Sequence, residues 1–288
     1  MKPDGSLVIK IASRARRCAL LIFAIYALLF PGSTLTPALD AVPVWGTSMG
    51  GLLMILQGST VIAWLAGVYG WRGVQVALVL PLAGWAIEQI GASSGFPFGR
   101  YSYSALLQPQ IGLVPVAITL AWLTLTLGAW QLARLTLTHD GRHAAPYQIA
   151  LLAATLTVVV DLQIETVASH INGYWIWIDG GFYEGIPPQN FVAWWCTGLL
   201  MSLTLERMLG SAARVPARSS NRVTHVVFPL LPGLLLLASS AMYTVINLAR
   251  GYLLPGIVGL IFLSIALLIA ARVRVALVPP RPLHQTAD

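Results

Sequence analysis

The sequence predicts an all-α protein: one bundle of about eight transmembrane helices with both termini in the cytoplasm. Of the 288 residues, 57% are hydrophobic and only 9% are charged, which is more apolar surface than a soluble core absorbs. Apolar stretches recur along the whole chain, each near the ~20 residues needed to cross the hydrocarbon of a bilayer. Arginine and lysine concentrate in alternate connections, as they do in polytopic membrane proteins.

The chain is expected to form a single transmembrane domain, residues 1–288, without an internal repeat or a soluble appendage. Three arginines precede the first apolar stretch, which ends near Pro31 and Gly32. No small-residue cleavage site follows this stretch, so we expect an uncleaved span rather than a signal peptide. The predicted spans are residues 18–36, 49–70, 73–91, 112–134, 146–168, 190–209, 224–248 and 252–272.

The basic residues set the expected orientation of the bundle. With the amino terminus in the cytoplasm, fifteen of the seventeen lysines and arginines fall on the inner side, and only Arg100 and Arg250 fall outside. Short cytoplasmic loops of membrane proteins are enriched in lysine and arginine. The sequence therefore predicts a multi-pass protein of the inner cell membrane with a cytoplasmic amino terminus.

The charge and the cysteines exclude several classes of protein. The net charge of +7 is spread through short loops and builds no phosphate-binding face, so a nucleic-acid partner is excluded. Lysine occurs only at Lys2 and Lys10, ahead of the first span, which excludes an intramembrane Schiff base to retinal. Cys18 and Cys196 lie in apolar segments, where a thiol behaves as a small hydrophobe.

One histidine pair has the spacing of a metal site. His139 and His143 are four residues apart, but Gly141 lies between them in an inner loop and no further histidine box is present. An oxygen-activating iron site needs more ligands than this pair supplies. The sequence predicts no metal site and no cofactor.

Acidic residues gather toward the predicted outer face. Glu88 ends the third span, and Asp161 and Glu165 lie in the outer half of the fifth. Their four-residue spacing puts Asp161 and Glu165 on one side of a helix, one turn apart. Two adjacent carboxyls in a low dielectric resist ionising together, so one is expected to hold its proton. Intramembrane acids usually mark function, although ion pairs with Arg100 or Arg250 are a structural alternative.

Most tryptophans, like these acids, lie toward the predicted outer face. Two interpretations stay open: an aromatic belt at the membrane interface, or a pocket whose rings face a long hydrocarbon. The tryptophans assigned to the outer half are Trp45, Trp85, Trp122, Trp175, Trp177, Trp194 and Trp195.

A series of motifs connects these acids and rings. Glu88 and Gly91 precede the loop Gly95-Phe-Pro-Phe-Gly-Arg-Tyr-Ser-Tyr103, and later come Asp161, Trp175-Ile-Trp177 and Gly181-Phe-Tyr-Glu-Gly-Ile-Pro-Pro-Gln-Asn-Phe191. Over about residues 80–200 the chain resembles the integral-membrane carotenoid biosynthesis protein family, whose characterised members are CruF-type hydratases of acyclic carotenoid end groups. Three positions depart from the family pattern: Leu162, Glu184 and Ala193.

The resemblance implies a hydro-lyase that adds water across the terminal 1,2 double bond of an acyclic carotenoid, without a cofactor, and gives a tertiary alcohol. Protonating an alkene creates a tertiary cation, which requires a carboxylic acid and stabilising rings. Asp161 or Glu165 is the expected acid, and Glu88 the second carboxyl that orients or deprotonates water. The expected substrate-binding residues are Phe96, Phe98, Arg100, Tyr101, Tyr103, Trp122, Trp175, Trp177, Tyr183, Asn190 and Trp194.

Three other functions stay open. A carotenoid end-group cyclase begins with the same protonation but lets an internal double bond capture the cation. A proton-coupled transporter also places acids in its spans, and a carotenoid-binding scaffold needs no chemistry. The expected partners are a carotenoid substrate and the lipid bilayer, and association with other carotenoid biosynthesis enzymes is an open alternative.

Overall fold

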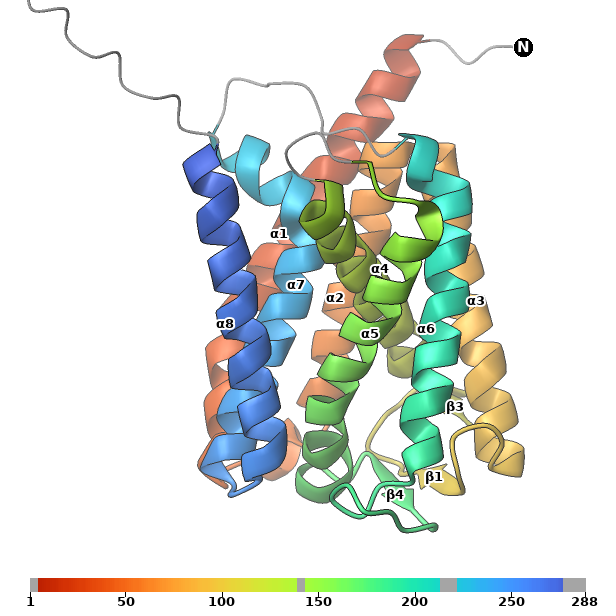
Figure 1. Ribbon diagram of the computed structural model, residues 1–288, viewed down its shortest axis with the longest axis vertical. Helices are drawn as coiled ribbons and strands as arrows, with labels where there is room; N and C mark the ends of the chain where they lie inside the picture. The colour runs from red at the N-terminus through yellow and green to blue at the C-terminus, as the bar shows by residue number, and fades with distance from the viewer. Residues whose placement is uncertain (1–4, 139–142, 213–221, 277–288) are drawn as a thin grey trace, which may run out of the picture.

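The computed structural model describes residues 5–138, 143–212 and 222–276. Across these ranges eight long helices run up and down side by side, so the all-α fold class is confirmed (Figure 1). The helices are α1 Gly5–Ala38, α2 Met49–Tyr69, α3 Trp71–Ser94, α4 Val116–Thr138, α5 Pro146–Glu165, α6 Pro188–Leu209, α7 Arg222–Ala249 and α8 Leu253–Ala276.

Seven helices in the described ranges are long and apolar enough to cross a membrane. The eighth, α6, has a similar length of 22 residues and lies alongside α5. Its hydropathy is lowered by polar side chains at both of its ends, among them Asn190 and Glu206. Both of these side chains are hydrogen bonded inside the bundle, so part of the low hydropathy of α6 comes from internal polar contacts.

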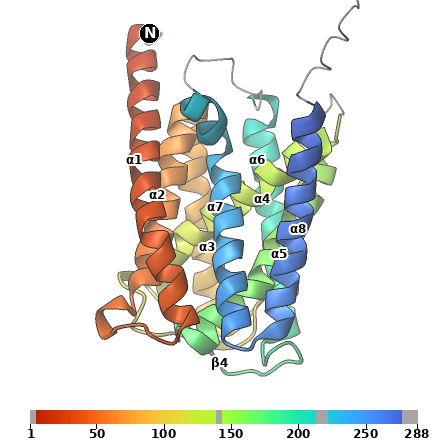
Figure 2. The same cartoon turned by 90° about the vertical axis from the view of Figure 1, so that its left-hand side faces the viewer.

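Helix α4 forms the centre of the bundle. It contacts α2, α3, α5, α6 and α7, and buried residues occur on all sides of it, as expected for a helix that is apolar all round. The peripheral helices α1 and α8 expose many large aliphatic side chains. Figure 2 shows α8 at the edge of the bundle with α7 beside it.

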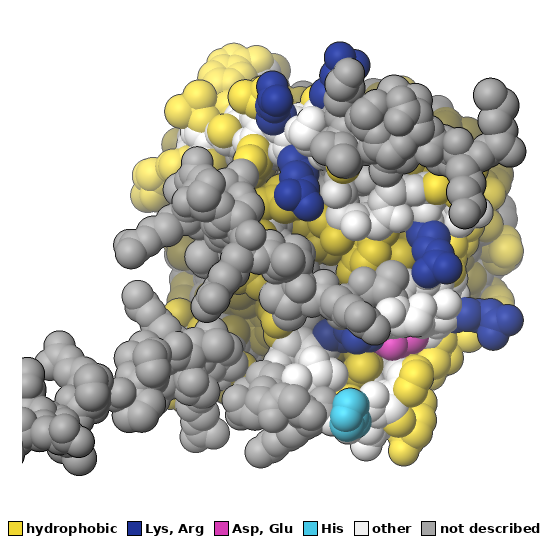
Figure 3. All heavy atoms as spheres, turned by 90° about the horizontal axis from the view of Figure 1, so that it is seen from above, with side chains coloured by type: hydrophobic (Ala, Val, Ile, Leu, Met, Phe, Trp, Pro, Cys, Tyr) yellow, Lys and Arg dark blue, Asp and Glu magenta, His cyan; other side chains and the backbone are white. Residues whose placement is uncertain are grey.

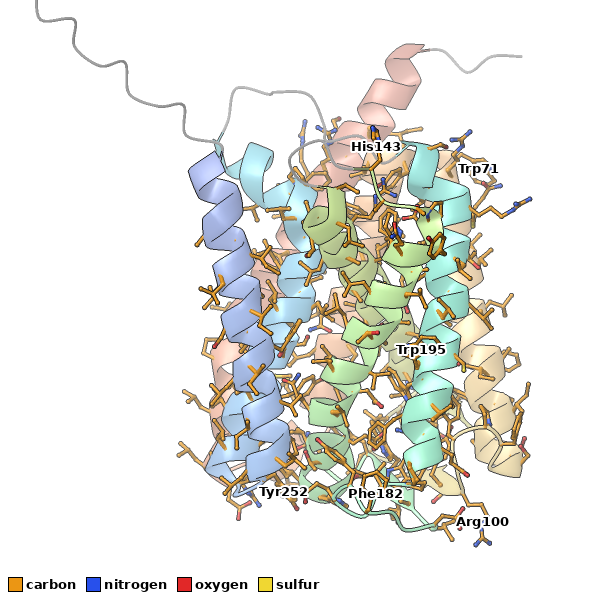
Figure 4. The ribbon with its side chains drawn as sticks, viewed as in Figure 1. Trp71, Arg100, His143, Phe182, Trp195 and Tyr252 are labelled. Carbon is orange, nitrogen blue, oxygen red and sulfur yellow. The ribbon has the colours of Figure 1, made fainter. Side chains whose placement is uncertain are left out.

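The two ends of the bundle differ. Helix α1 begins and α8 finishes at one end, which we call the terminal end, and all of the strands lie at the opposite end, the strand end (Figure 1). Arginine side chains gather at the terminal end, seen from above in Figure 3. Arg100 lies at the strand end, whereas Trp71 and His143 lie at the other (Figure 4). This arrangement agrees with the charge asymmetry of the sequence, and the cytoplasmic location of the terminal end stays a prediction.

Several helices are longer than their predicted spans. Helix α1 begins at Gly5, because the basic segment ahead of the apolar stretch is also helical. At its other end it continues through Pro31 and Pro37. Helix α4 reaches Thr138, four residues past the predicted end at 134. Hydropathy locates the part of a helix that meets lipid, and the helical hydrogen bonds continue beyond it.

Two short antiparallel sheets close the strand end. Strand β1, Tyr101–Tyr103, pairs with β4, Trp175–Trp177. Strands β2, Gln110–Ile111, and β3, Val114–Pro115, form a separate hairpin. The first pairing joins the α3–α4 connection to the α5–α6 connection, so loops far apart in the sequence form one cover over the bundle.

Glycine allows a close approach between α4 and α7. A Cβ atom added at Gly128 would lie 2.7 Å from the backbone oxygen of Pro232 and 2.8 Å from Cβ of Leu236. Backbone atoms cannot swing aside as a flexible side chain does, so a larger residue forces the two helices apart.

Replacing Gly128 with valine is expected to lower the free energy of unfolding by about 2 kcal/mol, the usual cost of overpacking a tight contact. Thermal unfolding in detergent measures the effect. Gly32→Ala is the control, since nothing lies within 4 Å of a Cβ added there. An unchanged Tm for Gly128→Val would contradict the close packing of α4 and α7.

Candidate active site

Three carboxyl groups are buried close to the strand end. Glu88 lies on α3, and Asp161 and Glu165 lie on α5. Their exposed fractions are 4%, 0% and 1%, respectively. Burying a carboxyl is costly unless hydrogen bonds or counter-charges compensate it, so the contacts of each group define what the site can do.

The sheet of β1 and β4 supplies many of those contacts. Its register pairs Tyr101 with Trp177 and Tyr103 with Trp175. Side chains two residues apart in a strand share a face, so both tyrosines and both tryptophans point toward the buried acids. We call these four residues the aromatic lid. Ring centroids lie 5.2 Å apart for Tyr101 and Trp177 and 6.1 Å apart for Tyr103 and Trp175.

Strand β1 binds Glu88. The hydroxyls of Tyr101 and Tyr103 donate to Oε2 of Glu88 at 2.5 and 2.8 Å. The indole N–H of Trp122, on α4, donates to Oε1 at 2.8 Å. Burial and the neighbouring Glu88 raise the pKa of both phenols, so the phenols keep their protons at neutral pH.

Strand β4 binds Glu165 in the same manner. The indole N–H groups of Trp175 and Trp177 donate to Oε2 of Glu165 at 3.1 and 2.9 Å. The side-chain amide of Asn190, in the first turn of α6, donates to Oε1 at 2.9 Å. Each strand of the lid therefore gives two donors to one oxygen of one acid.

Asp161 is the least satisfied of the three acids. The amide of Asn190 donates to its Oδ2 at 3.2 Å, and its buried Oδ1 has no hydrogen-bond partner among the described residues. Asn190 thus links Asp161 to Glu165. Directly after Glu165 the chain continues as a π-helix, Thr166–Ile171, a feature that occurs frequently at functional sites.

A cavity of ≈ 50 Å³ lies beneath the aromatic lid. Both Glu88 and Glu165 line it, and Trp122 and Trp194 form a stacked pair in its wall with centroids 4.1 Å apart. No lysine, arginine or histidine of the described residues lines it. The cavity therefore joins two carboxyl groups with ring faces, which attract a positive charge.

Most of the predicted site residues meet at this cavity. The substrate-binding predictions that the structure places in its wall are Phe98, Tyr101, Tyr103, Trp122, Trp175, Trp177, Asn190 and Trp194. Asp161, predicted as an acid, is not in the wall and is joined to the lining residue Glu165 by the Asn190 amide, which donates to both carboxyls.

The structure does not bring three other predicted residues to the cavity. Phe96 follows a left-handed turn at Gly95, and 74% of its side chain is exposed. Arg100 is drawn to the surface by Asp179, to which its guanidinium donates at 2.7 Å. Tyr183 is buried, but its hydroxyl donates to the backbone oxygen of Leu162.

The cavity also has contributions from α2 and α7 that were not predicted from the sequence. Met54 and Gln57 of α2 and Ser239 and Tyr243 of α7 also line the cavity. The amide nitrogen of Gln57 donates to the Ser239 hydroxyl at 2.9 Å. A glutamine in the middle of an apolar span was the available signal, but nothing in the sequence indicated which residues it faces.

His143 lies away from the acids. His143 is exposed at the terminal end (Figure 4), and His139 lies outside the described residues. His143 is therefore at the opposite end of the bundle from the carboxyl cavity, which lies at the strand end.

The aromatic lid is fastened at one edge by an ion pair. The backbone N–H and the guanidinium of Arg100 both donate to Asp179, at 2.8 Å and at 2.7–2.9 Å. Hydrogen bonds from Arg100 lower the pKa of the Asp179 carboxyl. The N–H of Ile178 also donates to the Arg100 backbone oxygen at 2.8 Å, so the fastening continues the β1–β4 ladder.

Fold and site together define a class: a membrane-embedded helix bundle that buries carboxyl groups in an aromatic cavity. The chain belongs to the carotenoid biosynthesis protein family, whose family model matches residues 49–266. Over 138 residues it is 35% identical to bisanhydrobacterioruberin hydratase of Haloarcula japonica. That match spans 47% of this chain and 45% of the relative. No solved structure matches the chain.

Asp179→Asn is expected to loosen the aromatic lid at neutral pH. Because the pKa of Asp179 is lower in the folded protein, its stabilising effect is present above the unfolded value of about 3.9 and is lost as the pH falls through the folded value. Amide hydrogen exchange at residues 101–103 and 175–177 should be faster in the variant than in the wild type at pH ~7. At a pH well below the pKa of Asp179 in the folded protein, the two proteins should exchange at equal rates.

Asp40→Asn is the matched control. Asp40 also pairs with an arginine, Arg250, but it lies in the α1–α2 connection and not in the lid. Equal exchange in all three proteins at neutral pH would show that the ion pair does not fasten the lid.

Proposed function

We propose that this protein hydrates the terminal 1,2 double bond of an acyclic carotenoid end group without a cofactor. The family supports a role in carotenoid biosynthesis, and the name of the H. japonica relative supports hydration. The observation that carries the proposal is that Glu88 and Glu165 line one aromatic cavity with no basic side chain in its described wall.

The reaction needs an acid, a base and a surface that tolerates a cation. Proton transfer to one carbon of the double bond leaves a tertiary cation on the other. Water attacks that carbon, and a carboxylate accepts the proton that the water loses. The proton count balances when the base returns its proton to the acid, so the carboxyls are regenerated and water is the only other reactant.

The partners of each carboxyl favour a division of roles. Indole and amide N–H groups can only donate, and Glu165 accepts from three such groups. This environment suits a carboxylate, so we assign Glu165 as the base. Phenols can donate or accept, so Glu88 can carry a proton on Oε2 and share it with Tyr101 or Tyr103. We assign Glu88 as the acid.

This assignment reverses the roles expected from the sequence, where Asp161 or Glu165 was the acid. Asp161 does not line the cavity and contacts it through Asn190, which also holds Glu165. A second anion one turn from Glu165 would be costly in this setting. Asp161 is therefore proposed to keep Glu165 and Asn190 in position and not to contact the substrate.

The size of the cavity fits a small apolar end group together with water. One water requires a cavity volume of ~10–15 Å³. The cavity volume of ≈ 50 Å³ therefore leaves room for a water beside a branched chain end. The amide of Asn190 and the carboxylate of Glu165 are hydrogen-bonding groups for that water. Trp122 and Trp194 present their stacked rings to the same space, where they stabilise the cation.

The acid variants test the assignment. Glu88→Gln and Glu165→Gln are each expected to reduce hydration at least ~100-fold, the usual contribution of a positioned acid or base. Asp161→Asn should keep activity within ~10-fold, since the amide fills the same volume and only a positioning role is lost. The measurement is the mass of carotenoid products, in which hydration adds one water and cyclisation adds none.

Deuterated water separates the two roles. Glu165→Gln is expected to return unhydrated substrate that carries deuterium, because protonation persists while water capture fails. Glu88→Gln should return substrate without deuterium. Abolished hydration in Asp161→Asn together with retained activity in Glu88→Gln would instead assign Asp161 as the acid.

The two phenols of the lid predict a non-additive effect. Tyr101 and Tyr103 bind the same oxygen of Glu88, so either phenol can compensate for loss of the other. Single changes to phenylalanine are expected to reduce the rate less than ~10-fold, and the double change more than ~100-fold. The same product assay measures all three variants. If the fold-reduction in the double variant equals the product of the two single fold-reductions, the phenols do not share a role.

A further inference from the structure

A second, larger cavity adjoins the acid cavity. Its volume is ≈ 140 Å³, against ≈ 50 Å³ for the first. It lies between the last turns of α1, the start of α2, the π-helix after α5, and α7, with Thr36, Gly46, Ala168 and Met242 among its lining residues.

The two cavities share part of their walls. Five residues line both of them: Met54, Gln57, Ile164, Trp175 and Tyr243. Trp175 belongs to the lid and binds Glu165, and the Gln57 amide is held by the hydroxyls of Tyr26 and Ser239 at 3.1 and 2.9 Å. These five shared residues therefore form the boundary that a ligand occupying both cavities would cross.

The lining of the second cavity excludes a charged ligand. None of its described lining residues is an acid or a base, and most are aliphatic, aromatic or small. Its polar groups are hydroxyls and amides, such as Ser33, Thr36 and Asn172. A site of this kind suits a long, neutral, unsaturated hydrocarbon.

The outer rim of this cavity lies next to exposed apolar residues. Val42, Gly46 and Thr47 of the α1–α2 connection line the cavity. In the same connection, Val44 and Trp45 are 90% and 76% exposed. Exposed apolar side chains on a membrane protein suit contact with lipid, and tryptophan is enriched at the bilayer interface. The rim thus borders the environment in which a carotenoid dissolves.

We propose that the second cavity holds the polyene segment that follows the reacting end group, and that the α1–α2 connection is where the substrate enters from the membrane. This inference rests on the proposed function for the identity of the ligand. The acid cavity alone accommodates only the chain end, so the rest of the substrate leaves through the wall formed by Met54, Gln57 and Tyr243. The second cavity then determines how well a long substrate binds, and the carboxyls determine whether it reacts.

A bulky residue on α1 tests this passage. Thr36→Trp places an indole in the second cavity, whereas Leu35→Trp adds the same residue at the neighbouring position, which is 53% exposed and does not line the cavity. Purified protein in detergent is incubated with a full-length acyclic carotenoid, and the pigment retained per protein is read from its visible absorption. Thr36→Trp is expected to weaken retention at least ~10-fold, and Leu35→Trp to match the wild type.

A short acyclic isoprenoid with the same terminal double bond provides a second measurement. It fills only the acid cavity, so its hydration should be equal in Thr36→Trp and the wild type while hydration of the full-length carotenoid falls. Ser33→Trp, another substitution in the lining, should reproduce the result if Thr36→Trp fails to fold.

The outcomes separate the two proposals. If the wild type retains the pigment but hydrates neither substrate, the proposed function fails, while loss of retention in Thr36→Trp still supports the passage. If folded Thr36→Trp and Ser33→Trp retain and hydrate the full-length carotenoid as the wild type does, the passage is overturned and the proposed function stands.

Discussion

The burial of carboxyl groups without neighbouring cations is the constraint on which the rest of this structure depends. Glu88 and Glu165 lie within a membrane-embedded bundle, where an unpaired charge is costly. Basic residues do not solve the problem here: Arg100 and Arg250 pair with acids at the strand end, outside the cavity. Indole N–H groups, phenols and one amide satisfy the acids instead.

Hydrogen bonding of the buried acids by neutral donors explains why the connections at the strand end form paired strands. Loops between transmembrane helices need only span the distance between helix ends, yet β1 and β4 pair with a fixed register. Because alternate side chains of a strand share a face, each strand places two donors within hydrogen-bond distance of one carboxylate oxygen. One strand holds the acid of α3 and the other holds the acid of α5, so the lid also ties these helices together. Hydrogen bonds of this kind leave the ring faces free to border the cavity.

The same arrangement suits chemistry on a hydrocarbon. A lysine or arginine in the cavity would stabilise the acids but repel a carbocation. Neutral donors stabilise the acids and leave a net negative environment in which a cation is favoured. The two adjoining cavities differ in the same respect, because the smaller one is lined by two carboxyl groups and the larger one by uncharged side chains.

The sequence by itself determined the fold class and most of the residue types of the site. Hydropathy and length are local properties, so they predicted the helices, apart from ends such as Gly5 of α1 that extend beyond the lipid-facing part. The positions of Glu88, Asp161 and Glu165 in predicted spans indicated the three acids, and the family resemblance indicated eight of the residues that line the cavity with Glu88 and Glu165. Gln57 was not among the predicted site residues, because its sequence position shows a polar residue within a span but not what it contacts.

Tertiary structure decided which of these groups meet. The i to i+4 spacing placed Asp161 and Glu165 on one side of α5, but the position of α6 decided that Asn190 lies between them and that only Glu165 reaches the cavity. Phe96, Arg100 and Tyr183 belong to the same motifs as the lining residues, yet turns and a surface ion pair direct them elsewhere. The second cavity is formed by α1, α2, α5 and α7 together, and contacts between distant segments are not encoded in any local pattern.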